Sequence, residues 1–111
     1  MNIILASKSI RRKKILEKLN IKFKIINSNY DESKIKSLDL SSIEICEELA
    51  FKKAETVSNL YCNDLIIGAD TIVTYNNKLL DKPRDEFEAF NHLSLLSGNT
   101  HYVYTAIHIL N

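Results

Sequence analysis

The spacing of hydrophobic positions predicts alternating strands and helices along the chain. The short apolar run at residues 2–6 is typical of a buried strand. Ser9 can cap the helix that follows, because its hydroxyl can accept from the free N–H groups of the first helical turn. That helix carries apolar side chains on one face: Ile15, Leu16 and Leu19. A second strand is expected at residues 23–27, before a polar and irregular stretch at 28–40.

Ser41 and Glu44 form a capping box that opens the longest predicted helix, which extends to about residue 61. Its apolar side chains recur at helical spacing: Ile43, Cys46, Leu49, Ala50, Ala54, Val57 and Leu60. The run DLIIGA at residues 64–69 then predicts a central strand of the sheet.

The last part of the chain predicts a hairpin, a helix and a final strand. Residues 72–75 and 78–80 flank Asn76 and Asn77, which tolerate the positive φ of a tight turn. Pro83 ends that pattern, and a short helix is expected at about 85–97, with Gly98 as its C-terminal cap. Residues 100–110 are rich in β-branched and aromatic side chains. The whole order predicts an α/β domain whose last strand leaves one sheet edge bare.

Composition narrows the class of protein. A chain of 111 residues suits one domain, residues 1–111, with a single core. No apolar run approaches the roughly 18 residues of a membrane span, so we expect no membrane partner and a cytoplasmic location. Two cysteines without metal-ligand spacing favour reduced thiols. Residues 1–24 carry eight basic side chains against Glu17 alone, so this segment is +7 and the remainder −6. This asymmetry suits a bound polyanion, or simply a solvated helix face.

The junction after the first strand, Ser7-Lys8-Ser9-Ile10-Arg11-Arg12, is a candidate phosphate site. A strand-to-helix turn presents free N–H groups and the positive end of the helix dipole. The chain has only two glycines, so a glycine-rich phosphate loop is excluded. Binding would therefore depend on the hydroxyls of Ser7 and Ser9 and on the guanidinium groups of Arg11 and Arg12.

At two further positions, a polar or charged side chain is attached to a stretch of backbone that we expect to be rigid. Asp70 and Thr71 follow the strand at residues 64–69, where a carboxylate is either a turn former or a metal ligand and base. Lys82 precedes Pro83, which stiffens the backbone, although taken alone such a position is more often an ordinary surface lysine.

Together these elements make an ordered set of motifs: LAS-x-S-x-RR, then Asp31-Glu32, Lys53, GADTIV, DKPRD and LSGNTH-x-V-x-T. From residue 3 to about 109, this order closely resembles the Maf family of nucleotide pyrophosphatases. The resemblance implies a fold related to that of inosine triphosphatase, here its N-terminal portion, with a mixed sheet flanked by helices. It also implies hydrolysis of a nucleoside triphosphate to the monophosphate and pyrophosphate. The Arg-Arg and Ala-Asp-Thr forms resemble the branch that prefers dTTP and UTP.

The resemblance further implies roles for individual residues. Asp70 matches the catalytic carboxylate, and Glu32 and Asp70 match the ligands of a divalent cation, Mg²⁺ or Mn²⁺. The positions that match substrate-binding residues are Ser7, Arg11, Arg12, Lys53, Thr71 and Lys82. Ile10 departs from the proline that the family usually has at the first helical turn, where we expect only a small loss of rigidity.

Family members continue well past residue 111, so the resemblance implies a domain incomplete at its C-terminus. We expect weak activity from residues 1–111 alone. The alternative is a non-catalytic remnant that binds nucleotide weakly or not at all. A nucleic-acid-binding module built on the basic block is disfavoured, because aromatic residues are not interleaved with it. A homodimer is left open.

Overall fold

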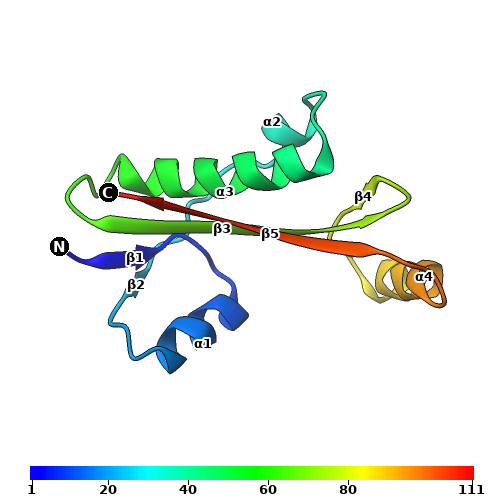
Figure 1. Ribbon diagram of the computed structural model, residues 1–111, viewed down its shortest axis with the longest axis horizontal. Coiled ribbons are helices and arrows are strands. Elements are labelled where there is room, and N and C mark those ends of the chain that lie inside the picture. The colour runs from blue at the N-terminus through cyan, green and yellow to red at the C-terminus, as the bar shows by residue number, and fades with distance from the viewer.

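The computed structural model describes residues 1–111 and contains one five-stranded mixed sheet with helices on both faces (Figure 1). Helix α3 covers one face, and α1 lies on the other face near the N-terminal strands. The elements, in chain order, are β1 (Ile3–Leu5), α1 (Ile10–Lys18), β2 (Lys24–Ile25), α2 (Ser33–Lys36), α3 (Ser42–Ser58), β3 (Leu65–Tyr75), β4 (Lys78–Leu80), α4 (Glu86–Leu96) and β5 (Tyr102–Leu110). The α/β class and the mixed sheet predicted above are confirmed.

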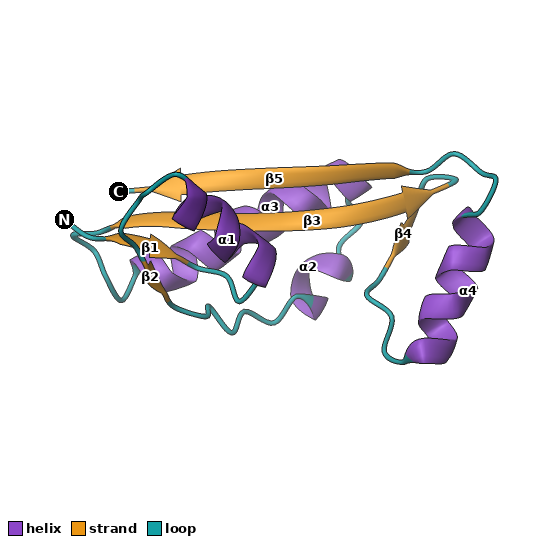
Figure 2. Cartoon of the chain, turned by 90° about the horizontal axis from the view of Figure 1, so that it is seen from below, coloured by secondary structure: helices purple, strands orange, loops and turns teal.

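Strand β3 is the centre of the sheet. Strand β1 pairs in parallel with its first residues, and β4 pairs antiparallel with its last residues. Strand β5 runs antiparallel along the other side of β3, from Ile66 opposite Leu110 to Thr74 opposite Tyr102 (Figure 2). Strand β2 extends the sheet beyond β1. Because β5 pairs only with β3, it is an edge strand, as the sequence predicted.

The core lies between α3 and the sheet. Ile4 and Ile66 are fully buried there against Ala54 and Val57 of α3. Gly68 lets the helix approach closely, since a Cβ at this position would collide with the carbonyl oxygen of Ala50 and with Ala54. This contact fixes the distance between α3 and β3, which carry three of the predicted site residues: Lys53, Asp70 and Thr71.

Several local predictions are confirmed by backbone geometry. Ser9 accepts from the N–H of Arg12 as the N-cap of α1, and the capping box of α3 is present. Asn76 and Asn77 have φ of 50° and 61°, as a tight hairpin turn requires. Gly98 follows α4 with a φ of 73°. No helix is long and apolar enough to cross a membrane.

The boundaries of other elements were predicted wrongly. Asp70 does not follow a strand that ends at residue 69, because β3 continues without interruption to Tyr75. Pairing with β5 holds the backbone extended through Asp70, which lies opposite Ala106. Strand β2 has only two residues, α3 ends at Ser58, and the stretch at 28–40 contains α2. No residue of α1 is buried, so its apolar face is only partly covered.

Candidate active site

A polar cavity of about 530 Å³ opens beside the turn between β1 and α1. It is enclosed by that turn, by the segment that precedes α2, by one residue of α3 and by the loop after β4. The lining residues are Ala6, Ser7, Lys8, Ser9, Arg12, Asn27, Ser28, Asn29, Tyr30, Glu32, Lys53 and Lys82. The cavity thus combines several hydroxyl and amide groups with four cationic side chains and one carboxylate.

The turn between β1 and α1 is organised by its two serines. The Ser7 side chain is buried at the end of β1, and its Oγ accepts from the N–H of Ser9 at 3.2 Å. The Oγ of Ser9 accepts from the N–H of Arg12 at 3.4 Å and so caps α1. These hydrogen bonds aim the first turn of α1 at the cavity, where the positive end of the helix dipole favours an anion.

Arg12 connects α1 with the turn after β1 and with strand β3. Its Nη1 donates to Oγ of Ser7 at 3.1 Å, and its Nη2 donates to Oγ1 of Thr71 at 2.9 Å. A guanidinium group has five N–H donors, so others remain for a ligand in the cavity. Arg11 is exposed on α1 and does not line this cavity, so its phosphate-binding role stays a prediction.

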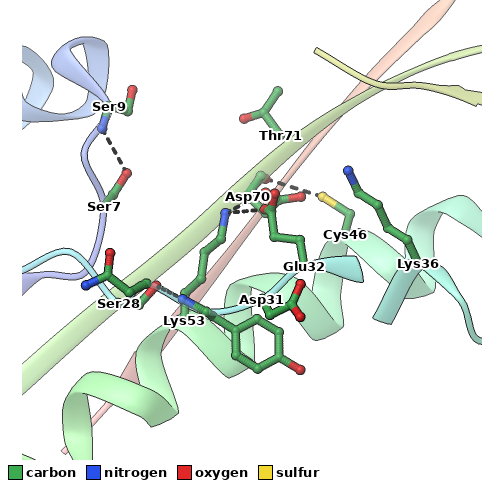
Figure 3. Close-up of polar contacts among 12 residues, drawn as sticks. Ser7, Ser9, Ser28, Asp31, Glu32, Lys36, Cys46, Lys53, Asp70 and Thr71 are labelled. Carbon is green, nitrogen blue, oxygen red and sulfur yellow. Dashed lines mark hydrogen bonds and ion pairs between the residues drawn. The ribbon is translucent and has the colours of Figure 1, made fainter. Parts of the chain in front are cut away.

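Lys53 of α3 lies between two carboxylates (Figure 3). Its Nζ is 2.9 Å from Oε1 of Glu32 and 3.0 Å from Oδ1 of Asp70. The Asp70 side chain is 10% exposed, and that of Lys53 is 19% exposed. The structure therefore brings together three predicted site residues from three different parts of the chain.

This contact shifts two pKa values. Burial raises the pKa of Glu32, but the hydrogen bond and positive charge of Lys53 outweigh it, and the pKa lies below its ordinary value of 4.5. Burial lowers the pKa of Lys53, but its two carboxylate partners outweigh that effect, and the pKa lies above 10.5. Lys53 is therefore an ammonium cation at neutral pH and does not serve as a base.

Asp70 and Thr71 are neighbours in sequence but lie on opposite faces of the sheet, because side chains alternate along a strand. Asp70 points toward Lys53 on the α3 face, whereas Thr71 contacts Arg12 of α1. In Figure 3, Thr71 points away from Asp70 and Lys53. Neither Asp70 nor Thr71 lines the polar cavity; each contacts a residue that does, Asp70 through Lys53 and Thr71 through Arg12.

Lys82 reaches the cavity from the loop after β4. Its neighbour Asp81 accepts from Nζ of Lys36 in α2 at 2.7 Å, which ties that loop to the segment carrying Glu32. Sequence reasoning missed the contribution of Lys8 and of residues 27–30 to the lining. The polar run Asn27-Ser28-Asn29, close before Asp31-Glu32, could have indicated that residues 27–30 line the cavity. No sequence pattern could have indicated the Lys36–Asp81 contact, because it joins residues far apart in the chain.

Two carboxylates, those of Glu32 and Asp70, are the metal-ligand groups beside the cavity. Glu32 and Asp70 each contact the ammonium group of Lys53 through one oxygen atom, and there is no group of three or more His, Cys, Asp or Glu side chains placed to hold a metal ion. Mg²⁺ typically binds one or two carboxylates and completes its shell with water and substrate phosphates. Two carboxylates beside an anion-type cavity fit that pattern, and they do not fit a closed structural zinc site.

An α/β fold with a cation-lined polar cavity at the end of its first strand defines a class of proteins suited to phosphorylated ligands. Within that class, this chain belongs to the Maf-like protein family, whose sequence model matches residues 2–111. The match confirms the resemblance inferred from the motifs.

Curated relatives match this chain over all or nearly all of its length. A dTTP/UTP pyrophosphatase of Clostridium novyi (strain NT) is 46% identical over 112 residues, which cover 100% of this chain and 58% of the relative. Proteins of the same name from Bacillus mycoides (strain KBAB4) and Clostridioides difficile (strain 630) are 45% and 43% identical, and the matches cover 98% and 100% of this chain. In both cases 56% of the relative is covered. The chain thus spans a little over half the length of these relatives.

Proposed function

We propose that this chain carries the phosphate-binding and catalytic groups of a nucleoside triphosphate pyrophosphatase that acts on dTTP or UTP. The products are the nucleoside monophosphate and pyrophosphate. The observation that carries the proposal is the ion-paired cluster of Lys53, Glu32 and Asp70, which joins the cavity also lined by Arg12 and Lys82. The names of the relatives support the choice of substrate.

The charges of the cavity suit this reaction. A triphosphate carries about four negative charges, and attack at the α-phosphorus shifts charge onto the departing pyrophosphate. Arg12, Lys53 and Lys82 supply cationic donors to these oxygens, and Ser7 supplies a hydroxyl. Thr71 contributes by accepting a hydrogen bond from Arg12, which orients the guanidinium group. In this proposal Arg11 attracts the substrate from its exposed position on α1.

Asp70 is the group we assign to proton transfer. Its carboxylate is buried at the centre of β3, and Lys53 holds it in place by a 3.0 Å hydrogen bond. A rigid carboxylate can accept the proton of an attacking water molecule. Lys53 remains charged throughout and orients both Asp70 and Glu32.

Glu32 and Asp70 are also the residues that would hold a divalent cation, Mg²⁺ or Mn²⁺. Such an ion neutralises phosphate charge and polarises the bond to be broken. Lys53 contacts Oε1 of Glu32 and Oδ1 of Asp70, so the second oxygen atom of each carboxylate is left for the ion.

The test is Asp70→Asn in the purified chain, assayed with dTTP and Mg²⁺ for release of pyrophosphate and dTMP. We expect at least a hundredfold loss of rate, since the variant lacks the base and one metal-binding charge. Asp39→Asn, which changes an exposed carboxylate away from the cavity, is the matched control and should retain the parental rate. Parental turnover by Asp70→Asn, with a native circular dichroism spectrum, would contradict the assignment.

The parent chain tests the non-catalytic alternative in the same assay. If the parent binds nucleotide and releases no product, that alternative is favoured.

A further inference from the structure

Thr105 of β5 belongs to the LSGNTH-x-V-x-T motif but does not line the polar cavity. In the sheet register it lies directly opposite Thr71 of β3. The two Oγ1 atoms are 3.0 Å apart, and either hydroxyl can be the donor. Figure 2 shows β5 running beside β3.

The hydrogen bond continues to α1. Oγ1 of Thr71 also accepts from Nη2 of Arg12 at 2.9 Å, and the other terminal nitrogen of Arg12 donates to Ser7 at 3.1 Å. Thr105, Thr71 and Arg12 therefore form a continuous series of hydrogen bonds from the edge strand to the polar cavity. An additional hydrogen bond on a hydroxyl restricts its rotation and strengthens its neighbours in the series.

The guanidinium group of Arg12 donates to two side-chain acceptors, Ser7 and Thr71. Arg12 and Thr105 also border a small, largely apolar cavity with Leu16, Ile67 and Ile107. An arginine side chain loses much rotamer freedom when its head is fixed. The Ser7 and Thr71 hydroxyls thus determine which way Arg12 points, and Thr105 determines where the Thr71 hydroxyl points.

From this geometry we infer that Thr105 is a positioning residue for nucleotide binding, acting through Thr71 on Arg12. The inference rests on the proposed function, because it takes Arg12 as a ligand of the triphosphate. Thr105 itself touches no substrate. Strand β5 thereby contributes to the phosphate site from the opposite side of β3.

The experiment measures binding of α,β-imido-dTTP, in which the bond to be cleaved is replaced by a non-hydrolysable bridge, by calorimetry in the presence of Mg²⁺. Thr105→Val keeps the β-branched shape and removes the hydroxyl. We expect it to raise the Kd about three- to tenfold, the effect of one hydrogen bond. Thr105→Ser restores the hydroxyl and should bind nearly as the parent does. Ile107→Val, on the same face of β5, is the control for a change in packing and should leave the Kd unchanged.

A double-mutant cycle separates positioning from a general structural effect. In an Arg12→Ala background, Thr105→Val should no longer change the Kd, since the group that it orients is absent. Equal effects of Thr105→Val with and without Arg12, or a parental Kd in Thr105→Val, would overturn the inference and leave the proposed function standing. A parent chain that does not bind the analogue would overturn both.

Discussion

At the scale of single residues, the positive charge of Lys53 dominates the electrostatics of the site. Its Nζ satisfies Glu32 and Asp70 together, and its neighbour Lys52 pairs only with Glu55 at 3.2 Å on a more exposed surface. Two adjacent lysines of one helix therefore have different consequences when they are neutralised. That contrast offers a matched pair of variants.

Lys53→Met should lower the free energy of unfolding by about 1.5–3 kcal/mol at neutral pH, because two carboxylates lose a charged hydrogen-bond partner. Lys52→Met should cost less than about 1 kcal/mol, as is usual for exposed ion pairs. The measurement is urea unfolding of both variants and the parent without added metal. Equal costs for the two lysines would show that the Glu32–Lys53–Asp70 contact is not the stabilising one.

The difference in stability between the parent and Lys53→Met should depend on pH in a definite direction. The pKa of Glu32 is below 4.5 in the folded chain, so its stabilising contribution is present above 4.5 and is lost as the pH falls through the folded pKa. The pKa of Lys53 is above 10.5, so its contribution is present below 10.5 and is lost as the pH rises through the folded pKa. The gap between parent and Lys53→Met should therefore be level from about pH 5 to 10 and shrink below pH 4.5. A carboxyl NMR titration should place the pKa of Glu32 higher in Lys53→Met than in the parent.

Arg11 and Arg12 are a second matched pair, with equal charge and different positions. Arg12→Ala should raise the KM or Kd for dTTP about tenfold or more, because the guanidinium group lines the cavity and would donate charge-assisted hydrogen bonds to a phosphate there. Arg11→Ala should have a smaller effect, as a change in long-range attraction only. Both substitutions should alter retention on single-stranded DNA alike and weakly. A steep, salt-dependent loss of DNA affinity with unchanged nucleotide binding would favour the basic block as a nucleic-acid patch.

At the scale of elements, the site depends on how closely α3 packs on β3. Lys53 comes from the helix and Asp70 from the strand, and Gly68 sets their separation because a Cβ there would meet Ala50 and Ala54. A displaced helix would therefore lengthen the Lys53–Asp70 contact as well as disturb the core.

Gly68→Ala should destabilise the chain by about 1–3 kcal/mol, which is typical of overpacking, and should reduce nucleotide turnover. Gly98→Ala is the comparison: its φ of 73° strains a side chain, but nothing lies within 4 Å of the added Cβ. It should cost about 1 kcal/mol and leave turnover intact. Thermal melting and the pyrophosphate assay together test this, and equal loss of activity in both glycine variants would argue against a role for the α3–β3 spacing.

At the scale of the whole molecule, the sheet presents an apolar edge. Strand β5 contains no charged Lys, Arg, Asp or Glu, and Val103, Ile107 and Ile109 are 57%, 64% and 60% exposed. Such an edge is a template for pairing with another strand. Backbone hydrogen-bonding groups and exposed hydrophobic side chains coincide along this strand.

We therefore predict that the polypeptide of residues 1–111 self-associates at micromolar concentration. Ile107→Lys should reduce light scattering and shift the chain toward the monomer, because a charge on the strand opposes edge pairing. Leu60→Lys replaces an even more exposed side chain, outside the sheet, and should change association little. A concentration-independent monomer for the parent in sedimentation velocity would contradict the prediction.

The sequence alone determined the features that depend on a few adjacent residues. The Ser9 cap, the Ser41–Glu44 capping box, the Asn76-Asn77 turn and the cap at Gly98 were all predictable, because each is a backbone preference or a hydrogen bond within three or four positions. The ordered motifs also determined the family.

Only the tertiary structure decided how these elements combine into a site. Pairing with β5 carries β3 through Asp70, although the local sequence favoured a strand end there. The alternation along that strand then sends Asp70 to Lys53 and Thr71 to Arg12 on opposite faces. The physical reason is that strand register and helix-to-sheet distance arise from contacts between residues far apart in the chain, and no local pattern encodes them.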